Sequence, residues 1–256
     1  MKEGHNMMKI YVGTSGFAHK EWKGSFYPEK ISGKDMLRFY AGRLNSVEIN
    51  NTFYHMPKES VLATWAEQVP RGFVFALKAP QIITHLKQLR NVFEETEYFI
   101  RSLSTLEAKL GPVLFQFPKS FRADAPALEN FLGIIPDDVA CAFEFRSLSW
   151  LDAGMPDLLR KKGCSLCIAD TDENPAQEIV GTAPWGYLRL RRSDYTDADL
   201  SRWAERILSQ KWEKAFIFFK HEDEAKGAEL AMHFQELMQS RLSGGKIEKG
   251  MARKAG

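Results

Sequence analysis

The chain has 256 residues, of which 44% are hydrophobic and 27% charged, a balance typical of a soluble globular protein rather than a disordered or fibrous one. Its formal net charge is +2, but residues 241–256 carry a net +4 on a body of −2, so a strongly basic nucleic-acid-binding body is not indicated. The three cysteines lie in apolar runs and the sequence shows neither a secretory leader nor an apolar membrane span, which predicts a reduced, cytoplasmic protein.

Short apolar segments alternate with amphipathic stretches along almost the whole chain. Strands are expected at 10–13, 46–50, 73–78, 113–117, 140–145, 165–169, 187–190 and 215–220. Helices are expected at 35–44, 58–68, 92–110, 125–132, 155–162, 197–210 and 225–240, whereas 171–185 lacks a helical pattern. Eight such units predict an α/β fold, a single (β/α)8 TIM barrel with eight parallel strands. A doubly wound open sheet is the alternative, but the loop at 13–16 lacks the full dinucleotide glycine fingerprint.

The expected organisation is one TIM-barrel domain at 8–240, between a disordered N-terminus at 1–7 and a basic flexible tail at 241–256. A basic tail adds only weak, salt-sensitive attraction to polyanions, so nucleic acid is a weakly supported partner. No membrane partner is expected, and no pattern predicts the oligomeric state.

An acid and a base stand two residues apart inside an apolar segment, at Glu144 and Arg146. Residues i and i+2 of a strand share a face, so the two side chains project together, and Glu48 and Asn50 share a face in the same way. Burying a charge costs several kcal/mol unless it is paired, so the pattern indicates an internal ion pair or the floor of a site.

Polar residues accumulate at the expected carboxyl ends of the strands, where barrel enzymes hold their active sites. Two or more carboxylates in different environments are suited to acid and base catalysis, so Glu144, Glu48 and Asp170 are the candidate catalytic residues. The structural alternative pairs Glu144 with Arg146 or Arg189, and Glu48 with Lys78.

Cations at the same strand ends predict a small-molecule anionic substrate, because arginine forks favour phosphate and carboxylate. These cations are Lys78, Arg146, Arg189, Arg191 and Lys220. The other candidate substrate-binding residues are Asn50, Gln116, His85, Thr14, Trp22 and Tyr54. The loop aromatics either stack on a sugar or base or form a small hydrophobic core of their own.

Four histidines, His19, His55, His85 and His221, fall in expected loops and, with the carboxylates, offer ligands for a mixed metal site. Their spacing matches no metal motif, so a divalent metal is not favoured and the cofactor stays unknown. Cys164 and Cys167 are interpreted as packed core residues rather than half of a zinc or redox motif.

Several motifs together resemble the YecE-like family, also called domain of unknown function 72. They are Val12 to Phe17, Trp22 with Gly24 and Phe26 to Pro28, Val47 to Tyr54, Phe73 to Lys78, Ile83 to His85, Leu110 to Pro118, and Glu144 to Arg146 with Ser149 and Trp150. The resemblance extends to about residue 238 and implies a TIM-barrel fold, without an established reaction. Where family members show a Phe-Asn-Asn-Asp-like segment, this chain has Phe219-Lys220-His221-Glu222.

Two functions follow as hypotheses. The first is a hydrolase-like enzyme acting on an anionic substrate, phosphorylated or derived from nucleic acid, and the second is a non-catalytic protein that binds a polyanion or metabolite. An enzyme should place Glu144 within hydrogen-bond reach of a second titratable group in an open pocket. Glu144 sealed in a bidentate pair beneath no pocket would weaken both hypotheses.

Overall fold

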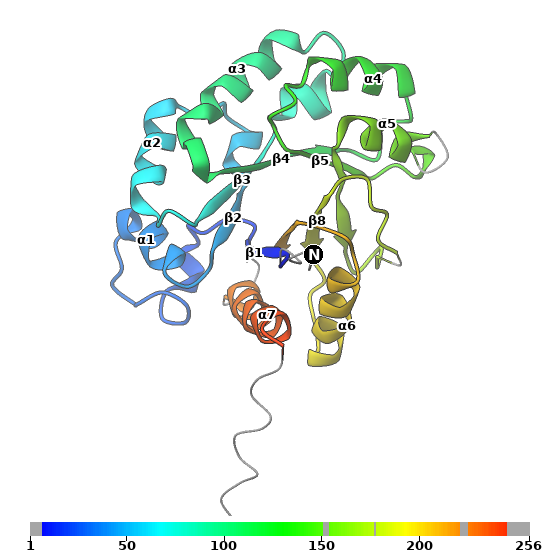
Figure 1. Ribbon diagram of the computed structural model, residues 1–256. Coiled ribbons are helices and arrows are strands. Elements are labelled where there is room, and N and C mark those ends of the chain that lie inside the picture. Colours follow the sequence, from blue (N-terminus) through cyan, green and yellow to red (C-terminus); the bar gives the residue numbers. More distant parts are fainter. Residues whose placement is uncertain (1–6, 151–153, 177, 221–224, 245–256) are drawn as a thin grey trace, which may run out of the picture.

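The computed structural model describes residues 7–150, 154–176, 178–220 and 225–244 (Figure 1). Its strands are β1 (Lys9–Thr14), β2 (Ser46–Ile49), β3 (Val74–Lys78), β4 (Leu110–Phe117), β5 (Cys141–Phe145), β6 (Ser165–Leu166), β7 (Ile168–Asp170), β8 (Trp185–Leu190) and β9 (Lys214–Phe219). Its α-helices are α1 (Met36–Ala41), α2 (Glu59–Gln68), α3 (Phe93–Leu103), α4 (Ala125–Ile134), α5 (Met155–Lys162), α6 (Asp197–Leu208) and α7 (Lys226–Leu242). The alternation predicted from the sequence is thus present.

Two details differ from the expected elements. The single strand expected at 165–169 is two short strands, β6 and β7, and the long helix expected at 92–110 ends at Leu103 and continues as a 3-10 helix, Ser104–Lys109. Within the described part of 171–185 no helix forms, as predicted.

The strands form two parallel sheets. One has four strands in the order β1-β9-β8-β7, and the other has five in the order β2-β3-β4-β5-β6. The prediction of a single closed barrel with eight parallel strands is therefore wrong: the fold is α/β, but the strand pairing is interrupted at two seams.

At the first seam, side chains replace the ladder that would join β1 to β2. The backbone N–H of Val12 donates to the side-chain oxygen of Asn45 at 2.7 Å, and that of Thr14 donates to the hydroxyl of Tyr40 at 2.9 Å. The Tyr40 hydroxyl donates in turn to the carbonyl of Ser46 at 2.9 Å. Within the described residues, the backbones of the two strands pair here at one isolated bridge, between Ser15 and Glu48. The side chains of Asn45 and Tyr40 bond the other backbone groups along this edge.

At the second seam, a threonine from the loop before β8 occupies the free edge of β6. The Thr182 hydroxyl accepts from the N–H of Leu166 at 2.7 Å and donates to the carbonyl of Cys164 at 2.7 Å. Sequence periodicity reports which residues are buried, and it carries no signal for such side-chain replacement of strand pairing.

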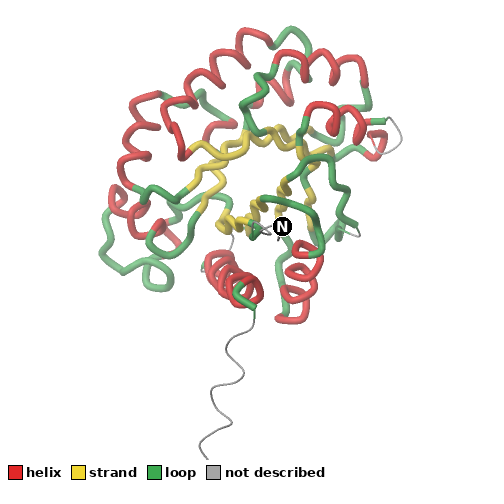
Figure 2. The backbone as a smooth tube through the Cα atoms, viewed as in Figure 1, coloured by secondary structure: helices red, strands yellow, loops and turns green. Residues whose placement is uncertain are grey.

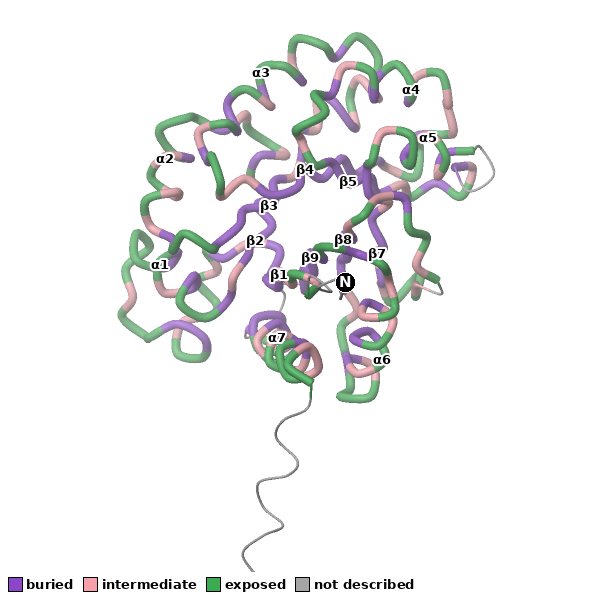
Figure 3. Tube along the Cα trace, in the orientation of Figure 1, coloured by how far each residue is buried: buried purple, intermediate pink, exposed green. Residues whose placement is uncertain are grey.

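The strands surround a common interior and the helices lie outside them (Figure 2). The strands are almost entirely buried, whereas exposed residues lie mainly on the outer faces of the helices and in loops (Figure 3). A large apolar cluster packs between strands and helices, and a smaller one contains every second residue of several strands: Val74, Ala76, Leu114, Ala142, Cys167, Tyr187, Phe216 and Phe218. Alternation along each strand therefore defines an inner and an outer face. None of the helices described is both long and apolar enough to cross a membrane.

Candidate functional site

The inner faces change from apolar to charged toward the carboxyl ends of the strands. On β8, Tyr187 belongs to the smaller apolar cluster, and Arg189 follows it two residues later on the same face. On β5, Ala142 belongs to that apolar cluster too, and Glu144 follows it in the same way. On β2, Glu48 lies beside Ser15 of the first seam. The polar layer therefore results from strand alternation applied to several strands at once.

Arg189 joins the two sheets. Its two terminal nitrogens donate to Glu144 Oε2 at 2.6 Å and to Glu48 Oε1 at 2.9 Å, and both carboxylates belong to the five-stranded sheet. All three side chains are buried, with residue exposures of 2%, 4% and 0%. Among the described residues the remaining nitrogen, Nε, has no hydrogen-bond partner. We call Glu48, Glu144, Arg189, Tyr187 and Ser15 the inner cluster.

Glu48 accepts four hydrogen bonds from the residues that the structure describes. Its Oε1 accepts from the Ser15 hydroxyl at 2.9 Å, from Asn50 at 3.2 Å and from Arg189, and its Oε2 accepts from the Tyr187 hydroxyl at 2.8 Å. Burial raises the pKa of this carboxyl, but Arg189, Arg191 and the hydrogen bonds outweigh burial and lower the pKa to about 2. Glu48 is therefore a fixed anion, with Arg189 as its partner instead of the Lys78 named in the sequence-based alternative.

Glu144 contacts two arginines through different oxygens. Oε1 accepts from Arg146 Nε at 3.1 Å, and Oε2 accepts from Arg189. Burial would raise the pKa of Glu144, but the two guanidinium groups lower it overall. Glu144 is thus not held in one bidentate pair, and the arginines keep it ionised.

Three further cations surround this cluster at the strand ends; we call Lys78, Arg146 and Arg191 the cationic rim. The Arg146 side chain is 49% exposed, and Arg191 donates to the Ser15 hydroxyl at 3.3 Å. The Lys78 ammonium lies 4.0 Å from the centre of the Phe53 ring. With Arg189, four cations face two carboxylates, so positive charge is in excess.

Four other predicted residues lie around the rim at different depths. Gln116 is buried and opposite Glu144 in the strand register. Asn50 is partly exposed and contacts Glu48. His85 packs on Phe53, and burial, followed by Lys78 and Arg146, lowers its pKa. Tyr54 is 65% exposed beside Phe53.

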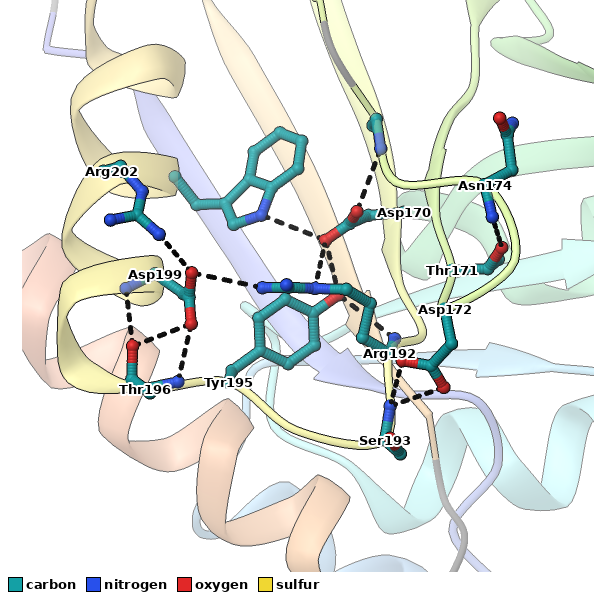
Figure 4. Close-up of polar contacts among 12 residues, drawn as sticks. Asp170, Thr171, Asp172, Asn174, Arg192, Ser193, Tyr195, Thr196, Asp199 and Arg202 are labelled. Atoms are coloured by element: carbon teal, nitrogen blue, oxygen red, sulfur yellow. Dashed lines mark hydrogen bonds and ion pairs between the residues drawn. The ribbon is translucent and has the colours of Figure 1, made fainter.

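Asp170 does not join the inner cluster. It pairs in register with Leu190, on the outer face of β8, whereas Ala169 pairs with Arg189. Its Oδ2 accepts from the Tyr195 hydroxyl at 2.8 Å and from the Trp203 indole at 3.3 Å, and forms an ion pair with Arg192 at 3.1 Å (Figure 4). Asp170 therefore links β7 to α6 and to the loop that precedes this helix.

Thr14 and Trp22 also lie away from the inner face. Thr14 is fully buried toward α1, where its hydroxyl contacts the Tyr40 hydroxyl at 2.9 Å and donates to the carbonyl of Gly16 at 2.6 Å. Trp22 is buried among His19, Phe26 and Tyr27. The aromatic residues of this loop therefore form a small core, one of the two arrangements considered from the sequence.

Sequence reasoning missed the roles of Tyr187 and Ser15. Tyr187 stands two residues before Arg189, and Ser15 stands two residues after Gly13, so strand alternation was a usable signal for each. Cys167, expected in the core, is buried there with its Sγ 4.0 Å from Glu144, and burial raises its pKa.

A metal centre and a deep cavity are the two remaining features sought at the site. No three His, Cys, Asp or Glu side chains gather as metal ligands within the part of the chain that the structure describes, and His221 lies outside that part. Two cavities, of about 600 and 50 Å³, lie against the first turn of α7. Neither of these two is lined by Glu48, Glu144 or Lys78.

The family model described as "Protein of unknown function DUF72" matches residues 11–252. The chain therefore belongs to the DUF72 family, as the sequence motifs predicted. The UPF0759 protein YecE of Escherichia coli (strain K12) is 30% identical over 155 residues, which is 60% of this chain and 54% of YecE. The UPF0759 protein YunF of Bacillus subtilis (strain 168) is 28% identical over 149 residues, 55% of this chain and 52% of YunF. The matches thus span about half the length of these relatives.

Two crystal structures of DUF72 proteins have a similar fold. That from Thermotoga maritima MSB8 has a TM-score of 0.80 and 27% identity, covering 90% of this chain and 99% of the other. That from Enterococcus faecalis V583 has a TM-score of 0.74 and 23% identity, covering 92% of this chain and 99% of the other. The matching family model is described as one of unknown function, so the comparisons show family and fold but no activity.

Proposed function

We propose that the protein binds a small anionic ligand, carrying phosphate or carboxylate, at the cationic rim. The excess of cations over carboxylates carries this proposal. Glu48 and Glu144 are both engaged by Arg189, so they offset less of the charge that Lys78, Arg146 and Arg191 present to a ligand. Arg146 bonds Glu144 through Nε, so its two terminal nitrogens are not used in that contact and could donate to a planar anion.

The charge states of the two glutamates favour binding over acid and base catalysis. A general acid or base works best when its pKa lies near the working pH, and Glu48, with a pKa of about 2, is far from that range. The pKa of Glu144 is also lowered. We therefore assign both glutamates to holding Arg189 and the rim in place.

Titration calorimetry with inorganic phosphate and pyrophosphate tests the proposal. Arg146→Gln removes one exposed guanidinium of the rim, and we expect about tenfold weaker binding, because a hydrogen bond to a charged group contributes about 1.5 kcal/mol. Arg202→Gln is the matched control, since this exposed arginine on α6 pairs only with Asp199 among the described contacts. Equal affinities of both variants and the wild type would refute the proposal.

The hydrolase-like activity is the second candidate. Glu144 raises the pKa values of Lys78 and His85, so these two titratable groups are close enough to feel its charge. Wild type and Glu144→Gln should be assayed against phosphoester and glycoside panels, with and without divalent metals. Turnover lost in Glu144→Gln would support an enzyme, and equal activities would remove Glu144 from this role.

A further inference from the structure

Lys78 differs from every other member of the inner cluster and rim. It is the last residue of β3 and follows Val74 and Ala76 on the inner face. Arg146, Arg189 and Arg191 each donate to an oxygen of the cluster, whereas no ion pair or hydrogen bond of the Lys78 ammonium is present among the described residues. Its described contact is with the face of Phe53, an uncharged ring. Within the part of the chain that the structure describes, Lys78 is therefore an amine without a carboxylate partner, beside the proposed anion site.

We propose that Lys78 is a nucleophilic amine that forms an imine with anionic aldehydes or ketones bound at the cationic rim. The neutral amine attacks the carbonyl carbon, a C–N bond forms, and the carbonyl oxygen leaves as water after taking up protons. The product is a C=N bond between Nζ and the former carbonyl carbon. The step consumes no oxidant or reductant, and hydrolysis reverses it.

The groups facing Lys78 favour the neutral amine that this step requires. Burial lowers its pKa most, and Arg189 and Arg146 lower it further, while Glu144 and Glu48 act in the opposite direction; the result is about 8. His85 also faces it, from the turn after β3. Near pH 7 roughly two hundred times more of this amine is neutral than of an ordinary lysine with a pKa of about 10.4.

The ligand class follows from the neighbours of Lys78 and rests on the proposed anion binding. Arg146 lies near enough to Lys78 to lower its pKa, so a carboxylate held by Arg146 would bring an adjacent carbonyl toward the Lys78 amine. An α-oxo acid has the two groups in that order: the carboxylate is recognised by guanidinium, and the adjacent carbonyl is the electrophile. Uncharged aldehydes lack the carboxylate, so the cationic rim should not speed their reaction with Lys78.

Glyoxylate with cyanoborohydride tests this inference, because reduction converts the imine into a stable carboxymethyl-lysine that peptide mass spectrometry locates. At pH 7 we expect Lys78 to be labelled at least about tenfold faster than Lys211, an exposed lysine near the opposite ends of the strands, because more of the Lys78 amine is neutral. Propionaldehyde, which has no carboxylate, should show a smaller preference for Lys78 over Lys211. Glycolate, which has the carboxylate but no carbonyl, should protect Lys78. Labelling of Lys78 should level off above about pH 8.

Variants separate this inference from the proposal on which it rests. Lys78→Arg removes the primary amine and should lose the adduct, whereas Lys211→Arg should be labelled at Lys78 as in the wild type. If glycolate binds and Arg146→Gln weakens that binding, but Lys78 is labelled no faster than Lys211, imine formation is refuted and anion binding stands. If glycolate and phosphate both fail to bind, both proposals fall. Near-ultraviolet circular dichroism of Lys78→Arg confirms that the variant is folded.

Discussion

The inner cluster and the network around Asp170 are built from the same residue types but differ in their charge balance. In each, a buried carboxylate contacts an arginine, Glu144 with Arg189 and Asp170 with Arg192. Around Asp170 the further donors are neutral, from Tyr195 and Trp203, and a second carboxylate, Asp199, shares Arg192 (Figure 4). The inner cluster and the cationic rim together hold four cations and two carboxylates, and one arginine nitrogen, Nε of Arg189, has no described partner. The two networks therefore differ in their excess charge and in the face of the sheet on which they lie.

Arg189→Met should have the largest effect, because it leaves Glu48 and Glu144 buried without their shared partner. We expect the free energy of unfolding at pH 7 to fall by about 3–5 kcal/mol, measured by urea denaturation. The same substitution at Arg202, an exposed arginine, should cost less than about 1 kcal/mol. If Arg189→Met lost no more than Arg202→Met, the inner cluster would not be what holds the two sheets together.

Lowering the pH should show how much Glu48 contributes to the free energy of unfolding. Its pKa falls from an ordinary 4.5 to about 2 on folding, so its ionised form stabilises the protein above pH 4.5, and this stabilisation is lost as the pH falls toward 2. A shift of this size corresponds to about 3 kcal/mol. We therefore expect the wild type to lose about 3 kcal/mol more than Glu48→Gln between pH 4.5 and 2. Parallel pH profiles of the two proteins would contradict the assignment.

Asp170→Asn should have the smallest effect, and only on stability. The amide keeps the shape but is a weaker acceptor for Tyr195 and Trp203 and loses the ion pair with Arg192, so we expect a loss of about 1–3 kcal/mol. Phosphate affinity, measured by calorimetry, should be unchanged, because Asp170 faces α6 and not the interior. A change in affinity at unchanged stability would place Asp170 in the binding site after all.

Strand alternation was the part of the site that the sequence could predict. It placed Arg146 with Glu144, and Asn50 with Glu48, and both contacts form, at 3.1 and 3.2 Å. The same alternation puts Asp170 with Ile168 on the outer face, away from Glu48 and Glu144. The contact between Arg189 and Glu48 joins residues on different sheets, and such a pairing depends on how the sheets meet, which a periodic pattern does not report.

The order and type of elements were likewise predictable, and the pairing of the strands was not. The number of strand and helix units suggested one closed sheet. The seams depend on single side chains, Asn45 and Tyr40 at one and Thr182 at the other, which bond backbone groups that a neighbouring strand would otherwise occupy. Asparagine, tyrosine and threonine near strand ends are too common for such a role to be predicted from the sequence.

The division into two sheets has a consequence for how the chain folds as it is synthesised. The five-stranded sheet is continuous in sequence from β2 to β6, whereas the four-stranded sheet pairs β1 with β9, at opposite ends of the described chain. Sequence-local pairings form early and distant ones late, so β2 to β6 should assemble while the rest is still emerging from the ribosome. During that interval Glu48 and Glu144 face water, and Arg189, arriving with β8, converts a hydrated edge into a closed interior.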